Sequence, residues 1–150
     1  FVVNQHSRLE GNKMTVKEYL SQTYRLDQRI NAKLEQVMAL RKLAAKATST
    51  ISDDVPSGVR NARRMEDIVM KIMDLENEIN ADIDSLIALK REIVSAIKAV
   101  PNLEYQTLLE LRYLCFKPWE QIAVKMGYDL RYTHKLHKRA LEECNIDAAA

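Results

Sequence analysis

Residues 118–139 read PWEQIAVKMGYDLRYTHKLHKR, which is the pattern of two short helices joined by a tight turn. The small side chain of Ala123 allows a second helix to cross closely, and Gly127 follows where the turn requires a positive φ. Four residues are spaced to seal both helices onto a core: Ile122, Met126, Tyr128 and Leu136. The stretch therefore predicts a helix-turn-helix.

Two polar residues of this stretch have predicted structural roles. Asp129 precedes the second helix and is expected to be its N-cap rather than a base-reading residue. Thr133 occupies an inward position, so its hydroxyl group must find a backbone carbonyl.

The second helix, predicted over 130–142, is strongly cationic, and no acidic residue occurs between Leu130 and Ala140. A cationic helix directly after such a turn is typical of a recognition helix, which contacts base edges and phosphates in the DNA major groove. An ordinary solvated basic face is the alternative. The predicted contacts are Arg131, Tyr132, His134 and Lys135 at the groove, Lys138 and Arg139 at the backbone, and Lys125 and Lys117 at further phosphates. Arg131 suits bidentate pairing with guanine.

The composition indicates an all-α protein. The chain has 150 residues, of which 47% are hydrophobic, but only three are Gly and three are Pro, too few for the turns that a sheet needs. The formal net charge is +2, with 23 basic and 21 acidic residues, so a DNA-binding surface must be local.

The sequence also predicts a cytoplasmic protein. Cys115 and Cys144 show no disulfide pattern and are expected to be free thiols. No apolar run approaches the roughly 18 to 20 residues that span a membrane, and no signal peptide is visible.

The N-terminal part predicts two long helices. Thr15 and Glu18 form a capping box, and the first helix continues to about Thr48. Its apolar stripe comprises Leu26, Ile30, Leu34, Val37, Leu40 and Ala44. Residues 53–58 are expected to form an exposed loop.

The second long helix is predicted over 63–100 and has a heptad pattern typical of a coiled coil. Its stripe comprises Met65, Ile68, Ile72, Leu75, Ile79, Leu86, Leu89, Ile93, Ala96 and Val100. Asp82 interrupts the stripe, either to set register or because it faces solvent at a stutter. The stripe is widened by Ile83, Ile87, Val94 and Ile97. The simplest arrangement is an antiparallel hairpin whose surplus apolar face is buried by a second protomer or by the C-terminal module.

These patterns divide the chain into modules. Residues 1–13 and 148–150 are excluded as a leader and a terminal addition, 14–100 form the coiled-coil hairpin, and 101–147 form the helix-turn-helix domain. Pro101 and Asn102 separate the modules, and a third helix is predicted over 103–116 with Leu108, Leu109, Leu111 and Leu114 buried.

No catalytic, metal or cofactor site is predicted. The sequence has no Gly-rich phosphate loop and no HExxH motif. His134 and His137 lack a completing ligand set, and Trp119 is expected to pack into the core. The acids at Glu66, Asp67, Asp74, Glu76 and Glu78 are expected to pair with Lys and Arg.

Residues 107–139 resemble region 4 of bacterial sigma factors. The resemblance rests on Leu108 to Tyr113 before the helix-turn-helix, on Trp119 to Ala123 within it, and on Arg139 to Leu141 at its end. The span 14–143 is similar to small phage and prophage proteins of low-GC Gram-positive bacteria, including regulators of the ArpU and RinA type.

The resemblance implies control of transcription, such as that of late phage genes. In sigma factors the matching helix reads the −35 promoter element, a role that would pass here to Arg131, His134, Lys135 and Lys138. Thr133 departs from the usual Val, and no segment resembles the sigma region for the −10 element. The expected partners are double-stranded DNA, a second copy of the chain and RNA polymerase. A terminase small subunit and a polymerase-binding adaptor are alternatives. A ring of eight or more subunits would indicate packaging, and a dimer would indicate regulation.

Overall fold

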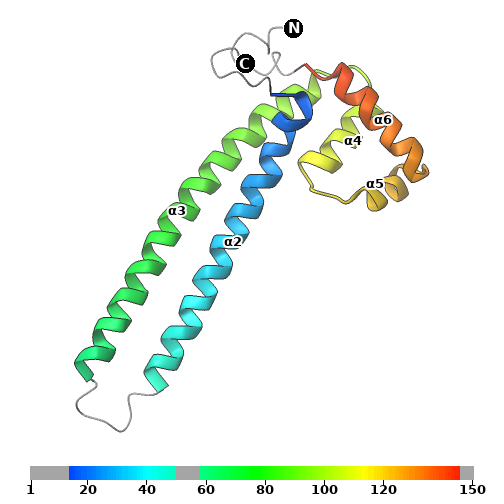
Figure 1. The fold of residues 1–150 in the computed structure, drawn as a ribbon. Coiled ribbons are helices and arrows are strands. Elements are labelled where there is room, and N and C mark those ends of the chain that lie inside the picture. The colour runs from blue at the N-terminus through cyan, green and yellow to red at the C-terminus, as the bar shows by residue number, and fades with distance from the viewer. Residues whose placement is uncertain (1–13, 50–57, 146–150) are drawn as a thin grey trace. The chain divides into compact units, whose positions relative to one another are not determined.

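The described part of the chain, residues 14–49 and 58–145 of a computed structural model, is all-helical, which confirms the predicted fold class (Figure 1). Its helices are α2 (Val16–Ser49), α3 (Gly58–Lys98), α4 (Leu103–Tyr113), α5 (Trp119–Met126) and α6 (Leu130–Glu143). The predicted leader, the loop at 53–57 and the terminal residues 148–150 lie outside the described residues.

The helix ends follow local capping rules. At the start of α2, the Glu18 N–H donates to Thr15 Oγ1 at 3.1 Å and the Thr15 N–H donates to Glu18 Oε2 at 2.8 Å, which confirms the capping box. α3 begins at Gly58, earlier than the predicted residue 63. α4 ends at Tyr113, three residues before the predicted end, since the chain turns through a left-handed residue at Phe116, with φ of 56°.

The described residues form two compact units, one within 27–85 and one that joins residues 14–26 with residues 86–145. The second unit combines α4, α5 and α6 with the adjoining ends of both long helices. The sequence placed the boundary at the Pro101 break, whereas the contacts divide the chain at residue 86. The heptad pattern of α3 continues past residue 86 because it shows only which residues face inward. It does not show which neighbouring helix packs against them.

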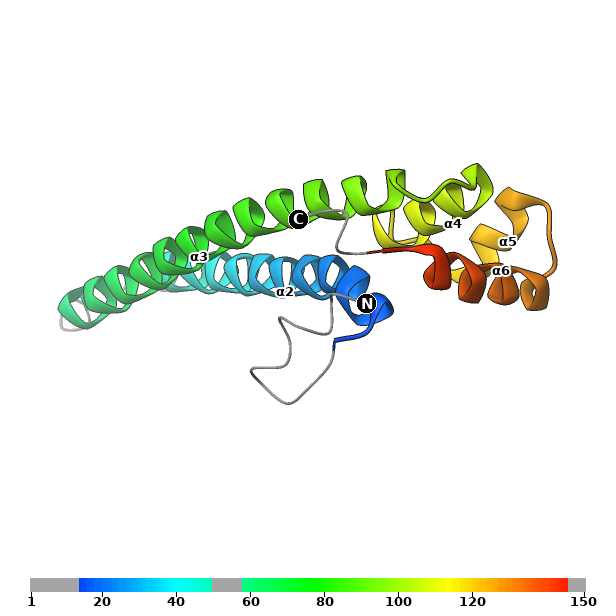
Figure 2. The same ribbon diagram turned by 90° about the horizontal axis from the view of Figure 1, so that it is seen from above.

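In the unit of 27–85, α2 and α3 lie side by side in both views (Figures 1 and 2). Their facing sides bury Ile30, Val37, Ile68 and Ile79, as the stripes predict. The predicted position of Leu34 is wrong, because its side chain remains 43% exposed. The inward position of that turn belongs to Lys33, whose side chain is only 12% exposed.

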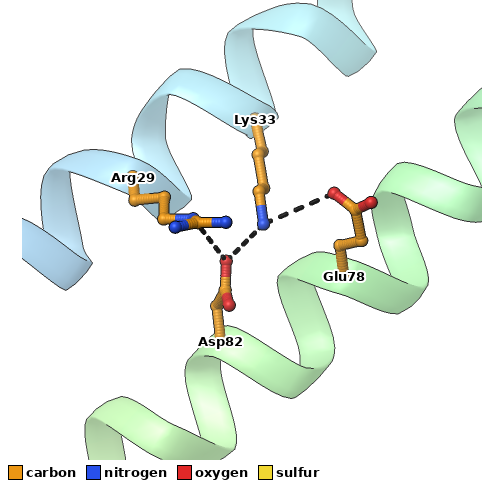
Figure 3. A network of polar contacts seen from close by, with 4 residues as sticks. All are labelled: Arg29, Lys33, Glu78 and Asp82. Atoms are coloured by element: carbon orange, nitrogen blue, oxygen red, sulfur yellow. Dashed lines mark hydrogen bonds and ion pairs between the residues drawn. The ribbon is translucent and has the colours of Figure 1, made fainter.

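Lys33 faces Asp82, the residue that interrupts the stripe of α3 (Figure 3). Lys33 Nζ lies 2.6 Å from Asp82 Oδ2 and 3.4 Å from Glu78 Oε2. Arg29 Nε lies 3.8 Å from the same Asp82 oxygen. The Asp82 side chain is 21% exposed. Asp82 therefore faces the neighbouring helix, and an ion pair occupies one layer of the coiled coil.

The other unit has a continuous apolar core drawn from all its helices. Its fully buried members include Leu20, Ile93, Ile97, Leu108, Leu109 and Ile122. Leu111 and Leu114 are only partly buried, unlike the prediction. The Thr23 hydroxyl is buried and donates to the Tyr113 carbonyl at 2.8 Å, so α2 is tied to the end of α4. The helix-turn-helix therefore packs against a core that it shares with α4 and with the ends of both long helices.

Candidate nucleic-acid interface

The turn between α5 and α6 has the predicted backbone geometry. Gly127 has φ 74° and ψ 29°, the left-handed region that favours glycine. The Tyr128 N–H donates to the Ala123 carbonyl at 3.0 Å, which closes the end of α5. No atom lies within 4 Å of the position that a Cβ at residue 127 would take, so the requirement is conformational and not steric.

Asp129 caps α6, as predicted. Its Oδ1 accepts a hydrogen bond of 2.7 Å from the Tyr132 N–H. The carboxylate therefore satisfies a free donor at the start of the helix. This contact fixes where α6 begins. Asp129 therefore has a structural role, and the first turn of α6 has no acidic residue.

The inward face of α6 is fully packed. Its buried residues are Thr133, Leu136, His137 and Ala140. The Thr133 hydroxyl donates to the Asp129 carbonyl at 2.8 Å, which provides the predicted backbone partner. Thr133 is therefore accommodated in a buried position without an unpaired polar group.

His137 belongs to this buried face and has no role at the surface. Its Nε2 shares a 2.6 Å hydrogen bond with the Tyr113 hydroxyl, and its ring centroid lies 4.5 Å from that of Trp119. Burial, followed by the nearby charges of Lys17, Arg112 and His134, lowers the pKa of His137 to about 4. The imidazole is therefore neutral near pH 7. The helical spacing of His137 from Thr133 and Ala140 was a signal of this role.

The unit that contains His137 is expected to lose stability in mild acid. The unfolded imidazole, with a pKa near 6.5, takes up a proton that the folded one binds only near pH 4, so stability falls as pH drops through this window. Between pH 7.5 and 5 the contribution is about 2 kcal/mol. Urea unfolding at both pH values should show this loss, and His137→Gln, which does not titrate, should lose less. An equal loss in the variant would contradict the assignment.

The outward face of α6 carries the residues that the sequence predicts as DNA contacts. The residues Arg131, Tyr132, His134, Lys135, Lys138 and Arg139 are all exposed. Arg131, Lys135 and Lys138 follow one another at steps of four and three, so helical periodicity aligns them directly opposite the buried face. We call these three residues the cationic row.

Tyr132 and His134, which lie beside the cationic row, make aromatic contacts within the domain. The Tyr132 ring lies edge-on to Tyr128, with centroids 4.8 Å apart, and the His134 ring lies 4.7 Å from that of Trp119. The Arg112 guanidinium lies 4.6 Å from the Trp119 ring. Trp119 is thus packed within the domain, as predicted.

The two lysines predicted outside α6 differ in exposure. Lys125 is exposed in the last turn of α5. Lys117 is half-buried before α5, and its carbonyl accepts a 3.1 Å hydrogen bond from Arg112 Nη1. The structure therefore presents Lys125 more openly than Lys117.

Other kinds of site receive no support from the described ranges. No group of three or more His, Cys, Asp or Glu residues there is arranged to hold a metal ion. Both cysteines are free, as predicted, with Cys115 exposed and Cys144 buried. None of the helices described has an apolar stretch of the length needed to cross a membrane.

Comparison with known proteins relates the chain to one family. Residues 42–145 match the family described as "Protein of unknown function (DUF1492)". The match begins within α2 and includes all of α3 to α6. Searches of curated proteins and of solved structures gave no match.

Proposed function

The chain belongs to the DUF1492 family, and we propose that it is a sequence-specific DNA-binding regulator of transcription. In this proposal α6 enters the major groove as the recognition helix. The resemblance to sigma region 4 and to phage and prophage regulators adds that the target is a promoter or operator. RNA polymerase is a further proposed partner.

The observation that carries the proposal is the two-sided construction of α6. One side is buried, with its polar groups paired, and the opposite side exposes the cationic row. A helix anchored in this way can present three cations to DNA without losing its own packing. Its exposed basic face would then gain phosphate contacts, which supply much of the affinity of DNA-binding proteins.

Positions along α6 suggest a division of roles. Arg131 lies one turn or less from the start of the helix, where side chains reach base edges, and its guanidinium suits a guanine. Tyr132, His134 and Lys135 are proposed to line the same groove. Lys138 and Arg139 lie further along and are proposed to contact phosphates, with Lys125 and Lys117 contributing from outside α6.

The proposal is tested by selection of duplexes from a random DNA library. We expect enrichment of one motif, and binding to it should weaken steeply with salt. If about five phosphates are neutralised, the slope of log K against log salt should be near −4 to −5. Weak binding without an enriched motif would contradict sequence-specific recognition. Such a result would instead favour the adaptor, with sequence choice made by a partner.

A further inference from the structure

Large apolar and aromatic side chains are exposed in the first turn of α6, where the cationic row begins. Leu130 is the first residue of the helix and is 41% exposed, and the Tyr132 side chain is exposed as well. Each is a chain neighbour of Arg131, so a rotation of about 100° per residue places them on either side of its direction. The first turn of α6 therefore combines the first cation of the row with apolar surface.

Leu130 is the member of this group whose exposure lacks a local reason. The Tyr132 ring packs edge-on against Tyr128, with centroids 4.8 Å apart, and its hydroxyl group suits contact with water. A leucine side chain has no polar group. Single exposed leucines are nevertheless ordinary on protein surfaces, so the place of Leu130 in the proposed interface must decide whether it has a role.

The charges along the outward face of α6 indicate which end of the helix would approach DNA. The cationic row ends at Lys138, and the exposed Glu142 follows on the same face four residues later. Phosphates would repel this carboxylate, whereas the first turn of α6 has no acidic residue. The charges therefore favour entry into the groove by the N-terminal end, which brings Leu130 and Arg131 to the bases.

A leucine at this place can recognise one feature of a base edge. In the major groove all four bases present hydrogen-bonding groups, and thymine adds a 5-methyl group beside its O4 acceptor. Leu130 has neither a donor nor an acceptor, so contact with a polar edge would displace water without replacing its hydrogen bonds. Contact with the thymine methyl removes apolar surface of both partners from water. Thymine is therefore the base that Leu130 favours.

We propose that Leu130 is a specificity-determining residue that packs on the 5-methyl group of a thymine in the target duplex. The inference rests on the proposed function, since α6 must enter the major groove. Consecutive Cα atoms are about 3.8 Å apart and stacked bases about 3.4 Å apart. The thymine consequently lies within about two base pairs of the guanine that Arg131 contacts.

Deoxyuridine tests this contact, because it keeps every hydrogen-bonding group of thymidine and lacks only the methyl group. Fluorescence anisotropy compares the selected duplex with duplexes in which each thymine is replaced in turn. One replacement should weaken binding of the wild-type protein by about three- to tenfold, as expected for the loss of one buried methyl contact. Leu130→Ala should weaken binding to the thymine duplex by a similar factor. In that variant the same replacement should then change binding by less than about twofold, because the contact is already absent.

Leu103 provides a matched control for Leu130. It is the first residue of α4, it follows the capping side chain of Asn102 as Leu130 follows that of Asp129, and it is 75% exposed. Leu103→Ala should therefore keep the full sensitivity to deoxyuridine. Leu130→Met remains apolar and of similar volume, so it should keep most of that sensitivity. Helical circular dichroism establishes that each variant is folded.

The outcomes separate this inference from the proposed function. Deoxyuridine that binds as well as thymine at every position would overturn the role of Leu130 and leave sequence-specific binding intact. So would a deoxyuridine penalty that Leu130→Ala leaves undiminished, or an enriched motif that contains no thymine. Failure to enrich any motif would instead refute the proposed function, and the Leu130 contact with it.

Discussion

Replacing Arg131 and Lys135 together with alanine is expected to weaken binding to the selected duplex by about 30- to 1,000-fold, or 2 to 4 kcal/mol. Arg131 supplies a candidate guanine contact and Lys135 extends the cationic row by one turn. Fluorescence anisotropy should measure both the selected and a scrambled duplex. Discrimination between the two duplexes should decrease, and the salt slope should fall by about 1 to 2.

A matched control separates these contacts from simple loss of charge. Arg91 and Lys98 are exposed in the same compact unit but lie on α3, so Arg91→Ala with Lys98→Ala removes two charges away from α6. This control should retain discrimination. Arg131→Lys should keep most of the salt slope and lose preference at one base pair, because lysine lacks the bidentate fork. Undiminished discrimination in the Arg131 and Lys135 double variant would refute the proposed role of α6.

The helix-turn-helix could be predicted because local rules determine it. The positive φ of Gly127, the cap at Asp129 and the backbone bond of Thr133 each involve partners within a few residues. The same applies to the capping box at Thr15. Solvent exposure of the cationic row also followed from spacing alone, because a helix with one apolar side turns the other side outward.

The partners of two polar residues on inward positions could not be identified from the sequence, because these partners are distant along the chain. His137 bonds to Tyr113, which lies 24 residues earlier. Lys33 bonds to Asp82, which lies 49 residues later. The sequence pattern favoured Leu34 as the inward residue since an apolar side chain normally outcompetes a lysine. The opposing carboxylate reverses that preference, and only the pairing of the two helices reveals it.

The Lys33–Asp82 pair leads to the second large prediction. Asp82→Ala should lower the free energy of unfolding by about 2 kcal/mol, because it leaves the Lys33 ammonium in a mostly buried position with only Glu78 nearby. The figure is below the 3 to 5 kcal/mol typical of fully buried pairs, since both side chains retain some solvent contact. Urea unfolding followed by circular dichroism at neutral pH measures it.

The double variant Lys33→Met with Asp82→Leu should behave in the opposite way. It replaces the whole layer with apolar side chains, so no charge remains buried, and its stability should equal or exceed that of the wild type. A double variant as unstable as Asp82→Ala would show that the ion pair itself stabilises the hairpin. The gain in stability should come with a loss of structural specificity, because a continuous apolar stripe also suits shifted helix registers and other oligomers. Sedimentation should then show masses that the wild-type protein does not form, since the buried pair is satisfied only when Lys33 and Asp82 lie in the same layer.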